Sequence, residues 1–204
     1  MSDSKLKIIA GLGNPDQKYA KTRHNVGFLI VEALASQANI SINKSGFYSK
    51  YVKTKIKGVS LFLVKPLTYM NRSGVSIHKF ASYYKVAMED IIIIHDDMDL
   101  EFGKIKIVKN RGHGGHNGIR SIIDAFGKKN CIRIRIGVGH PTLQKFRTQE
   151  NITGHVLGNF SREEIKILDS MINTACDAAL HILQKGSTSA MNLYNCHVTD
   201  LSAR

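Results

Sequence analysis

Residues 91–97 read Ile-Ile-Ile-Ile-His-Asp-Asp, and this stretch decides the fold. Four consecutive β-branched residues are typical of a strand that is covered on both faces, because successive side chains point to opposite sides of a sheet. Such a strand lies inside a sheet that has helices on both faces. The sequence therefore predicts an α/β sandwich, in which His95, Asp96 and Asp97 directly follow the buried part of the strand.

Further strands are expected before and after this one in the sequence. Apolar or alternating patterns occur at residues 5–10, 51–56, 60–64, 105–108 and 132–138. Gly58 separates the second and third of these segments, so they are predicted to form a hairpin. The last two segments alternate charged with apolar residues, and each is therefore expected to have one face in water.

Helical patterns lie between the strands. Residues 25–37 and 71–84 carry apolar side chains at helical spacing, and Ser161 with Glu164 predicts a capping box that begins the last long helix. No repeat or linker divides the chain. We therefore expect one domain over residues 1–204, with C-terminal helices at about 161–195 packed on it. The predicted fold is a single-domain α/β sandwich, whose twisted, mixed and mostly parallel sheet is flanked by helices.

The charge of the chain favours a polyanionic partner. Its 204 residues include 29 Lys and Arg against 16 Asp and Glu, which gives a formal net charge of +13. No apolar run approaches the roughly 18 residues that a membrane span requires. The N-terminus has only a few consecutive apolar residues, which are too few for the core of a signal peptide. The three cysteines form no CxxC pair for zinc or redox chemistry. Nucleic acid in the cytoplasm is therefore the expected partner.

The first candidate site segment follows the strand at 5–10 and reads Gly-Leu-Gly-Asn-Pro at residues 11–15. It lacks the third glycine of a dinucleotide fingerprint, so a nucleotide cofactor is disfavoured. His24 lies at the start of the next predicted helix, where a partly exposed neutral imidazole can accept a proton from water. A loop histidine is also often only solvated, and its position alone leaves both interpretations open.

Polar residues also follow two other predicted strands. An asparagine amide both donates and accepts hydrogen bonds, so Asn71 suits a peptide backbone, although it could equally cap a helix. A carboxylate beside an imidazole fixes its tautomer and stabilises the imidazolium, which is the role we expect for Asp96. Ligand crevices in α/β sheets lie beyond the carboxyl ends of strands. We therefore expect these residues to converge on one cleft with Asn14, Tyr19 and Tyr69.

A glycine-rich stretch lies further along the chain. Residues 111–118 contain three glycines within four positions before a helix-like run, and such a backbone suits a phosphate or a carbonyl oxygen. His113 and His116 are spaced like weak metal ligands, but zinc needs more donors than this segment supplies. From Lys104 to Arg147 there are 11 Lys and Arg and one acidic residue. We interpret this run as a track for the phosphates of a nucleic acid.

In their order and spacing these segments resemble the bacterial-type peptidyl-tRNA hydrolase family. The resemblance is carried by GLGNPDQKYAKTRHNVG at 11–27, KPLTYMNRSG at 65–74, HDDMDL at 95–100, GHGGHNGIRSI at 112–122 and RIRIGVGHP at 133–141. It runs along nearly the whole chain and is weaker after about Pro141. The resemblance implies an enzyme that hydrolyses the ester bond between a peptide, or an N-blocked aminoacyl group, and the 3′ end of tRNA.

The resemblance also implies roles for individual residues. The implied catalytic residues are His24 as general base, Asp96 as the group that stabilises its active form, and Asn14 near the attacked carbonyl. The implied substrate- and tRNA-binding residues are Tyr19, Tyr69, Asn71, Asn117, Lys106 and Arg135, of which the last two would hold a tRNA phosphate. The chain departs from the family pattern near this phosphate site: Val108, next to Lys109, stands where relatives can carry another basic residue, and Arg111 replaces a frequent glycine. Residues 142–158 would form a mobile lid.

The implied reaction needs only activated water, because an ester to a ribose hydroxyl has a good leaving group. We therefore expect no metal and no cofactor. Peptidyl-tRNA is the expected partner of a monomer that needs neither a membrane nor an obligate protein partner. Two other interpretations stay open: a non-catalytic RNA-binding module on the same fold, and a metal-dependent hydrolase built on His113, His116 and the carboxylates of residues 96–99.

Overall fold

The computed structural model describes residues 5–140 and 149–195 of the chain. Within them, seven strands form one sheet in the order β2-β3-β4-β1-β5-β7-β6. The strands are β1 (Lys7–Gly11), β2 (Lys44–Gly46), β3 (Ser49–Ile56), β4 (Val59–Pro66), β5 (Ile91–Asp97), β6 (Ile105–Lys109) and β7 (Ile132–Gly137). The α-helices are α1 (Val26–Gln37), α2 (Ser73–Tyr83), α3 (Asn117–Phe126), α4 (Gln149–Leu157) and α5 (Arg162–Tyr194).

The sheet is mixed, as predicted. Its central strands β4, β1, β5 and β7 run parallel to one another. Antiparallel strands extend it at both ends, where β3 pairs with β4 in the predicted hairpin and β6 pairs with β7. The carboxyl ends of the parallel strands consequently meet at one edge of the sheet, which is where ligands bind in such folds.

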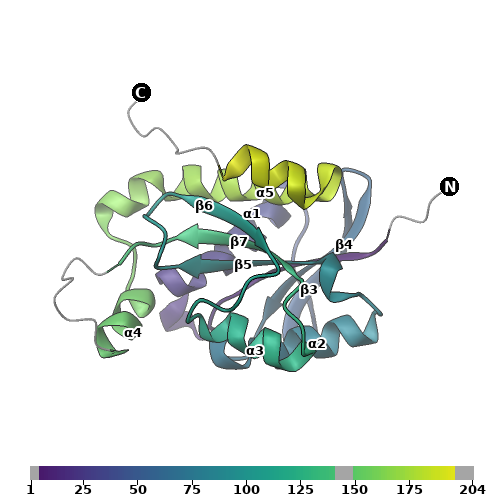
Figure 1. Ribbon diagram of the computed structural model, residues 1–204, viewed down its shortest axis with the longest axis horizontal. Helices are drawn as coiled ribbons and strands as arrows, with labels where there is room; N and C mark the ends of the chain where they lie inside the picture. The colour runs from purple at the N-terminus through teal and green to yellow at the C-terminus, as the bar shows by residue number, and fades with distance from the viewer. Residues whose placement is uncertain (1–4, 141–148, 196–204) are drawn as a thin grey trace.

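Helices cover both faces of the sheet (Figure 1). Ile92 and Ile94 of β5 pack in the apolar cluster of α1 and α5, whereas Ile91 and Ile93 pack in the cluster of α2 and α3. Both sets are almost completely buried. As predicted, each face of β5 contacts a helical layer. This contact explains why the strand contains four consecutive isoleucines. In the described residues no helix is long and apolar enough to cross a membrane.

One part of the structure, the strand β7, differs from what the sequence patterns predicted. The alternation in β7 does not mark a solvated face, since Arg133 is only 3% exposed. β7 lies between β5 and β6, and inner strands of this kind are covered on both sides. In the C-terminal region, α5 begins with the predicted capping box of Ser161 and Glu164, and its residues form two helices joined across a kink at Gly186.

Two glycines bring the first loop against the centre of the sheet. A Cβ atom on Gly11 would lie 2.0 Å from the carbonyl oxygen of Gly27, so the end of β1 and the start of α1 touch through their backbones. The backbone N–H of Leu12 donates to the carbonyl oxygen of Ile94 at 2.9 Å. These contacts place the segment just before α1 next to the carboxyl end of β5.

The edge strand β6 is covered by a side chain from the C-terminal end of α5. The amide of Asn195 accepts from the backbone N–H of Ile107 at 2.7 Å and donates to its carbonyl oxygen at 2.9 Å. One side chain thus occupies both backbone groups that Ile107 directs away from β7.

Candidate active site

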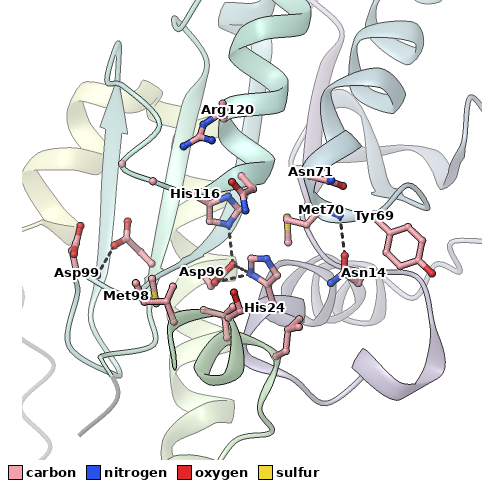
Figure 2. A pocket seen from close by; sticks show the side chains of 18 of the residues that line it. Asn14, His24, Tyr69, Met70, Asn71, Asp96, Met98, Asp99, His116 and Arg120 are labelled. Atoms are coloured by element: carbon pink, nitrogen blue, oxygen red, sulfur yellow. Dashed lines mark hydrogen bonds and ion pairs between the residues drawn. The ribbon is translucent and has the colours of Figure 1, made fainter. Parts of the chain in front are cut away.

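The predicted base and its carboxylate partner are in contact. His24 lies in the short 3-10 helix η2 (Arg23–Asn25) before α1, and Asp96 lies at the end of β5. Nδ1 of His24 is 2.8 and 2.9 Å from the two carboxylate oxygens of Asp96 (Figure 2). Because an ionised carboxylate can only accept, Nδ1 carries the hydrogen. The other ring nitrogen of a neutral His24, Nε2, therefore holds the lone pair that can accept a proton.

The two groups shift each other's pKa. Burial lowers the pKa of His24, but the charge and the hydrogen bond of Asp96 raise it more, so the pKa lies above its ordinary value of 6.5. Burial raises the pKa of Asp96, and the interactions with His24 and His116 outweigh it, so this pKa lies well below its usual range. Asp96 is therefore ionised at neutral pH, although its side chain is only 2% exposed.

A second histidine contacts the same carboxylate. Nε2 of His116 lies 3.0 Å from Oδ1 of Asp96, and Nδ1 of His116 accepts from the backbone N–H groups of Gly118 and Ile119. His116 is thus the N-cap of α3 as well as a partner of Asp96. The carboxylate of Asp96 lies between two imidazoles that come from different parts of the chain.

These groups border a cavity of about 740 Å³, here called the main cavity. Its wall contains most of the predicted site residues, namely His24, Asp96, Asn14, Tyr69, Asn71 and Asn117. Tyr19 is not among the residues that line it. The wall also includes Met98 and three apolar residues of α4: Ile152, Val156 and Leu157. The lining of the main cavity therefore combines side-chain amides with apolar groups.

Asn14 is held in one orientation by two other segments. Its backbone N–H donates to Oδ1 of Asn25 at 2.8 Å, and Nδ2 of Asn25 donates to the backbone carbonyl of Asn14 at 3.0 Å. Its side-chain oxygen accepts from the backbone N–H of Met70 at 2.9 Å (Figure 2). With the oxygen occupied, the amide nitrogen remains as a donor at the cavity wall.

Tyr69 stands at the rim of the main cavity and is 51% exposed. Its hydroxyl donates to Oδ2 of Asp16 at 2.8 Å, and this hydrogen bond raises the pKa of Tyr69 above 10.0. The contact joins the loop after β1 to the loop after β4. A neutral, partly exposed ring is thereby fixed beside the opening of the cavity.

The predicted phosphate-binding residues lie in a separate cavity of about 510 Å³, here called the basic cavity. Its basic lining residues are Lys106, Lys109, Arg111, Arg133 and Arg135. Arg135 forms an ion pair with Asp97, and Asp97 lines both the basic and the main cavity. Burial lowers the pKa of Arg133, whose guanidinium lies inside a region of like charge. The two cavities are therefore neighbours at the end of β5.

The donor atoms of His24, Asp96 and His116 all lie within 4.8 Å of one another, and such a group could hold a metal ion. Each of these atoms already takes part in a hydrogen bond within the group. A metal would have to displace two ring protons and break both bonds to Asp96. The arrangement is better suited to hydrogen bonding than to metal binding, and His113 of the proposed metal set is not part of it. That the chain uses no metal stays a prediction.

Sequence reasoning missed several residues of this site. It treated His116 only as a weak metal ligand, although a histidine one residue before a helix can be a cap. It assigned neither Asn25 nor two residues that line the main cavity, Arg120 and Met98, to the site. The predicted lid at 142–158 lies partly outside the described residues. Its described part is mostly the helix α4, which the pattern of apolar residues in the sequence did not predict.

Comparisons with known proteins agree with the fold and identify the family of the chain. Residues 8–202 match the model of the family described as peptidyl-tRNA hydrolase. The chain is 43% identical over 188 residues to the peptidyl-tRNA hydrolase of Clostridium novyi (strain NT), covering 92% of this chain and 97% of that protein. It is 40% identical to that of Syntrophotalea carbinolica, covering 95% and 98% respectively. The solved peptidyl-tRNA hydrolase of Acinetobacter baumannii superposes with a TM-score of 0.87 at 39% identity, covering 95% of this chain and 96% of that one. The chain therefore belongs to the peptidyl-tRNA hydrolase family.

Proposed function

We propose that this chain hydrolyses the ester bond of peptidyl-tRNA with water that His24 activates. The observation that supports this most strongly is the contact between Nδ1 of His24 and the buried carboxylate of Asp96 at the wall of the main cavity. This contact leaves Nε2 as the basic atom, and it stabilises the imidazolium that forms when a proton arrives.

The reaction proceeds through addition of water and loss of the ribose oxygen. Nε2 of His24 takes a proton from water while the water oxygen bonds to the ester carbonyl carbon. The resulting tetrahedral oxyanion then collapses, and the bond to the terminal ribose oxygen of tRNA breaks. That oxygen receives the proton from the imidazolium, so that His24 returns to its neutral form. The products are a peptide with a free carboxylic acid and a tRNA with a free ribose hydroxyl.

Side-chain amides stabilise the negative charge that develops during this reaction. Asn14, Asn71 and Asn117 lie in the wall of the main cavity, and the amide nitrogen of Asn14 is available to a substrate oxygen. An oriented donor to an oxyanion typically contributes about 3 kcal/mol to the stability of a transition state. Which of the three amides contacts the oxyanion and which the peptide is decided by the pose of the substrate.

The same amides favour substrates in which the amino group of the esterified residue is blocked. A peptide or N-blocked group offers carbonyl and N–H partners to the asparagines at the cavity wall. A free aminoacyl ester would instead bring an ammonium charge into a partly dry site, which is unfavourable without a partner. Tyr69 at the rim is placed to contact the end of the tRNA or the peptide, and Tyr19 is assigned there from the family resemblance alone.

The basic cavity is assigned to the tRNA backbone. Lys106 and Arg135 line it next to the main cavity, so that a tRNA whose 3′ end lies at His24 can bring a phosphate to them. We further propose that residues 1–204 act as one monomeric domain in the cytoplasm, where translation takes place. These last assignments come from the family and the charge of the chain.

The test is an ester-release assay with three substrates or conditions. N-acetylated aminoacyl-tRNA is expected to lose its acyl group, unblocked aminoacyl-tRNA is expected to react far more slowly, and excess EDTA is expected to change neither rate. Binding of tRNA without any release of the acyl group would favour the non-catalytic RNA-binding module. Loss of activity on chelation, with recovery on adding a metal, would favour the metal-dependent hydrolase.

The matched variant is His24→Asn. An asparagine amide nitrogen occupies nearly the place of Nδ1, so it can still donate to Asp96, but it has no atom in the place of Nε2. We expect turnover to fall by about 10²- to 10⁴-fold, which is the usual contribution of a general base. Binding of tRNA, measured separately, should be preserved. A variant with turnover near that of the wild type would remove His24 as the base.

A further inference from the structure

Among the described residues, His116 is the one residue besides His24 whose ring nitrogen contacts the carboxylate of Asp96. It precedes α3 directly, and its side chain is only 9% exposed. Its two ring nitrogens face different structures: one faces the N-terminus of the helix and the other faces the carboxylate (Figure 2). His116 takes no part in the proton transfers of the proposed reaction.

The helix determines which nitrogen of His116 carries the hydrogen. Nδ1 lies 3.1 Å from the backbone nitrogen of Gly118 and 3.2 Å from that of Ile119, and both groups are donors. Nδ1 must therefore be an acceptor without a hydrogen, and in the neutral ring Nε2 then carries it. A proton on Nδ1 would break both contacts and would add positive charge at the positive end of the helix dipole. The Nε2–H of His116 thus points at Oδ1 of Asp96.

The other groups around Asp96 do not replace this donor. His95 donates from Nδ1 to the backbone carbonyl of Asp96 at 2.7 Å, so it does not hold the carboxylate itself. The ring of His95 packs against that of His116 at 4.6 Å, and burial keeps the pKa of His95 well below 6.5, so His95 is neutral. The positive charge of Arg133 also lowers the pKa of His95, and Asp97 pairs with Arg135. The carboxylate of Asp96 is therefore held from two sides, by His24 and by His116.

We propose that His116 is a positioning residue, whose Nε2–H fixes the carboxylate of Asp96 in the orientation that holds His24 as a base. This proposal rests on the proposed function of His24 and Asp96. Both oxygens of Asp96 approach Nδ1 of His24, and the additional bond at Oδ1 opposes rotation of the carboxylate away from it. The same bond takes up part of the negative charge of Asp96, so that Asp96 binds the proton of His24 less strongly.

Two substitutions separate the two contacts of His116. In His116→Asn, the side-chain oxygen lies where Nδ1 was and still caps α3, but no atom reaches Asp96. In His116→Gln, the amide nitrogen lies where Nε2 was and can still donate to Asp96, but the cap is lost. The experiment measures kcat, KM, the pH dependence of kcat/KM and the midpoint of urea unfolding for both variants, with N-acetylated aminoacyl-tRNA as the substrate.

We expect His116→Asn to keep the wild-type unfolding midpoint and KM but to lower kcat about tenfold, as the loss of a supporting hydrogen bond does elsewhere. The acid limb of its pH profile should move to higher pH, because Asp96 without its donor holds the proton of His24 more tightly. His116→Gln should unfold at lower urea concentration and yet keep the wild-type pH profile and a kcat close to that of the wild type.

Two results would overturn the proposal. One is a His116→Asn variant with the kcat and the acid limb of the wild type. The other is a loss of kcat that parallels the loss of stability in both variants, while the acid limb of the pH profile is unshifted in both. His24→Asn is measured in parallel. If it is inactive while His116→Asn is normal, only the role of His116 fails; if both are active, the proposed function of His24 fails.

Discussion

The side-chain oxygen of Asn14 accepts a hydrogen bond of 2.9 Å from the backbone N–H of Met70. Met70 begins the 3-10 helix η3 (Met70–Arg72), so the loop after β4 sets the direction of an amide in the loop after β1. Since the backbone N–H and carbonyl of Asn14 are also paired with the side chain of Asn25, the whole residue is held in place by other protein groups. Its amide nitrogen can then act as a preorganised donor.

Asn14→Asp tests this donor. An aspartate has nearly the same shape and can still accept from Met70, but in place of the amide nitrogen it has a second oxygen that cannot donate. We expect the fold to be kept and kcat/KM on N-acetylated aminoacyl-tRNA to fall about 100- to 1,000-fold. The exposed Asn43→Asp, which makes the same change of charge elsewhere, should leave the rate unchanged. A normal rate for Asn14→Asp would exclude donation by this amide.

The pH profile tests the contact between His24 and Asp96. Asp96 raises the pKa of His24 above 6.5, and only the neutral ring is a base, so kcat/KM should decline as the pH falls through a value above 6.5. In Asp96→Asn only the effect of burial remains, so the acid limb should move below 6.5. Its maximal rate should also fall on the order of 10³-fold or more, because the tautomer of His24 is no longer fixed. An unchanged acid limb in Asp96→Asn would contradict the assignment.

Lys106→Gln tests the basic cavity. Lys106 is exposed and lines that cavity, so it is expected to neutralise one phosphate. We expect KM to rise with kcat nearly unchanged, and the slope of log Kd for tRNA against log salt concentration to decrease by about one. Lys55→Gln removes the same charge from the exposed side of β3 and should have little effect. Identical salt slopes for wild type and Lys106→Gln would place the phosphate elsewhere.

Glu164→Gln tests how the catalytic segment is attached to α5. Glu164 forms two hydrogen bonds with Arg23, the neighbour of His24, at 2.6 and 3.1 Å. Burial raises the pKa of Glu164, but Arg23 and the backbone N–H of Ser161 lower it more, so the net pKa lies below 4.5. The stabilisation is therefore complete above pH 4.5 and is lost as the pH falls through the lowered pKa of the folded protein.

We expect Glu164→Gln to reduce the free energy of unfolding at pH 7 by about 2 kcal/mol, the typical contribution of hydrogen bonds to a charged group. The difference from the wild type should shrink when urea unfolding is repeated at pH values below the folded pKa. The neighbouring Glu163→Gln, which changes an exposed side chain, is the control. A difference that persists unchanged at low pH would show that the charge of Glu164 is not responsible.

Local sequence patterns predicted the elements whose apolar faces are long and regular. The four isoleucines of β5 and the capping box at Ser161 and Glu164 were recognised because packing and capping impose a specific residue order. The strand β2 (Lys44–Gly46) was not, since it is short and offers no buried side chain. Arg133 shows a further limit: alternation assigns a residue to one side of a strand, but it does not tell what covers that side.

The candidate site could be predicted only in part for a related reason. His24 and Asp96 are separated by 72 residues, and their contact depends on how β1, β5 and α1 pack together. The resemblance to a family identified the pair without that geometry. It did not show that His116 contacts Asp96, because this contact depends on the direction in which α3 begins. It also did not show that Tyr19 is absent from the lining of the main cavity.

The contact of Asn195 with Ile107 bears on how copies of this protein behave toward one another. An open strand edge can pair with the edge of another molecule, and such pairing can continue without limit into insoluble assemblies. At one end of the sheet, Asn195 already occupies the outward backbone groups in the middle of β6. At the other end, β2 has only three residues, among them the exposed Lys44. Both ends thus resist growth by strand addition, which would help a strongly basic chain to stay dispersed at high concentration.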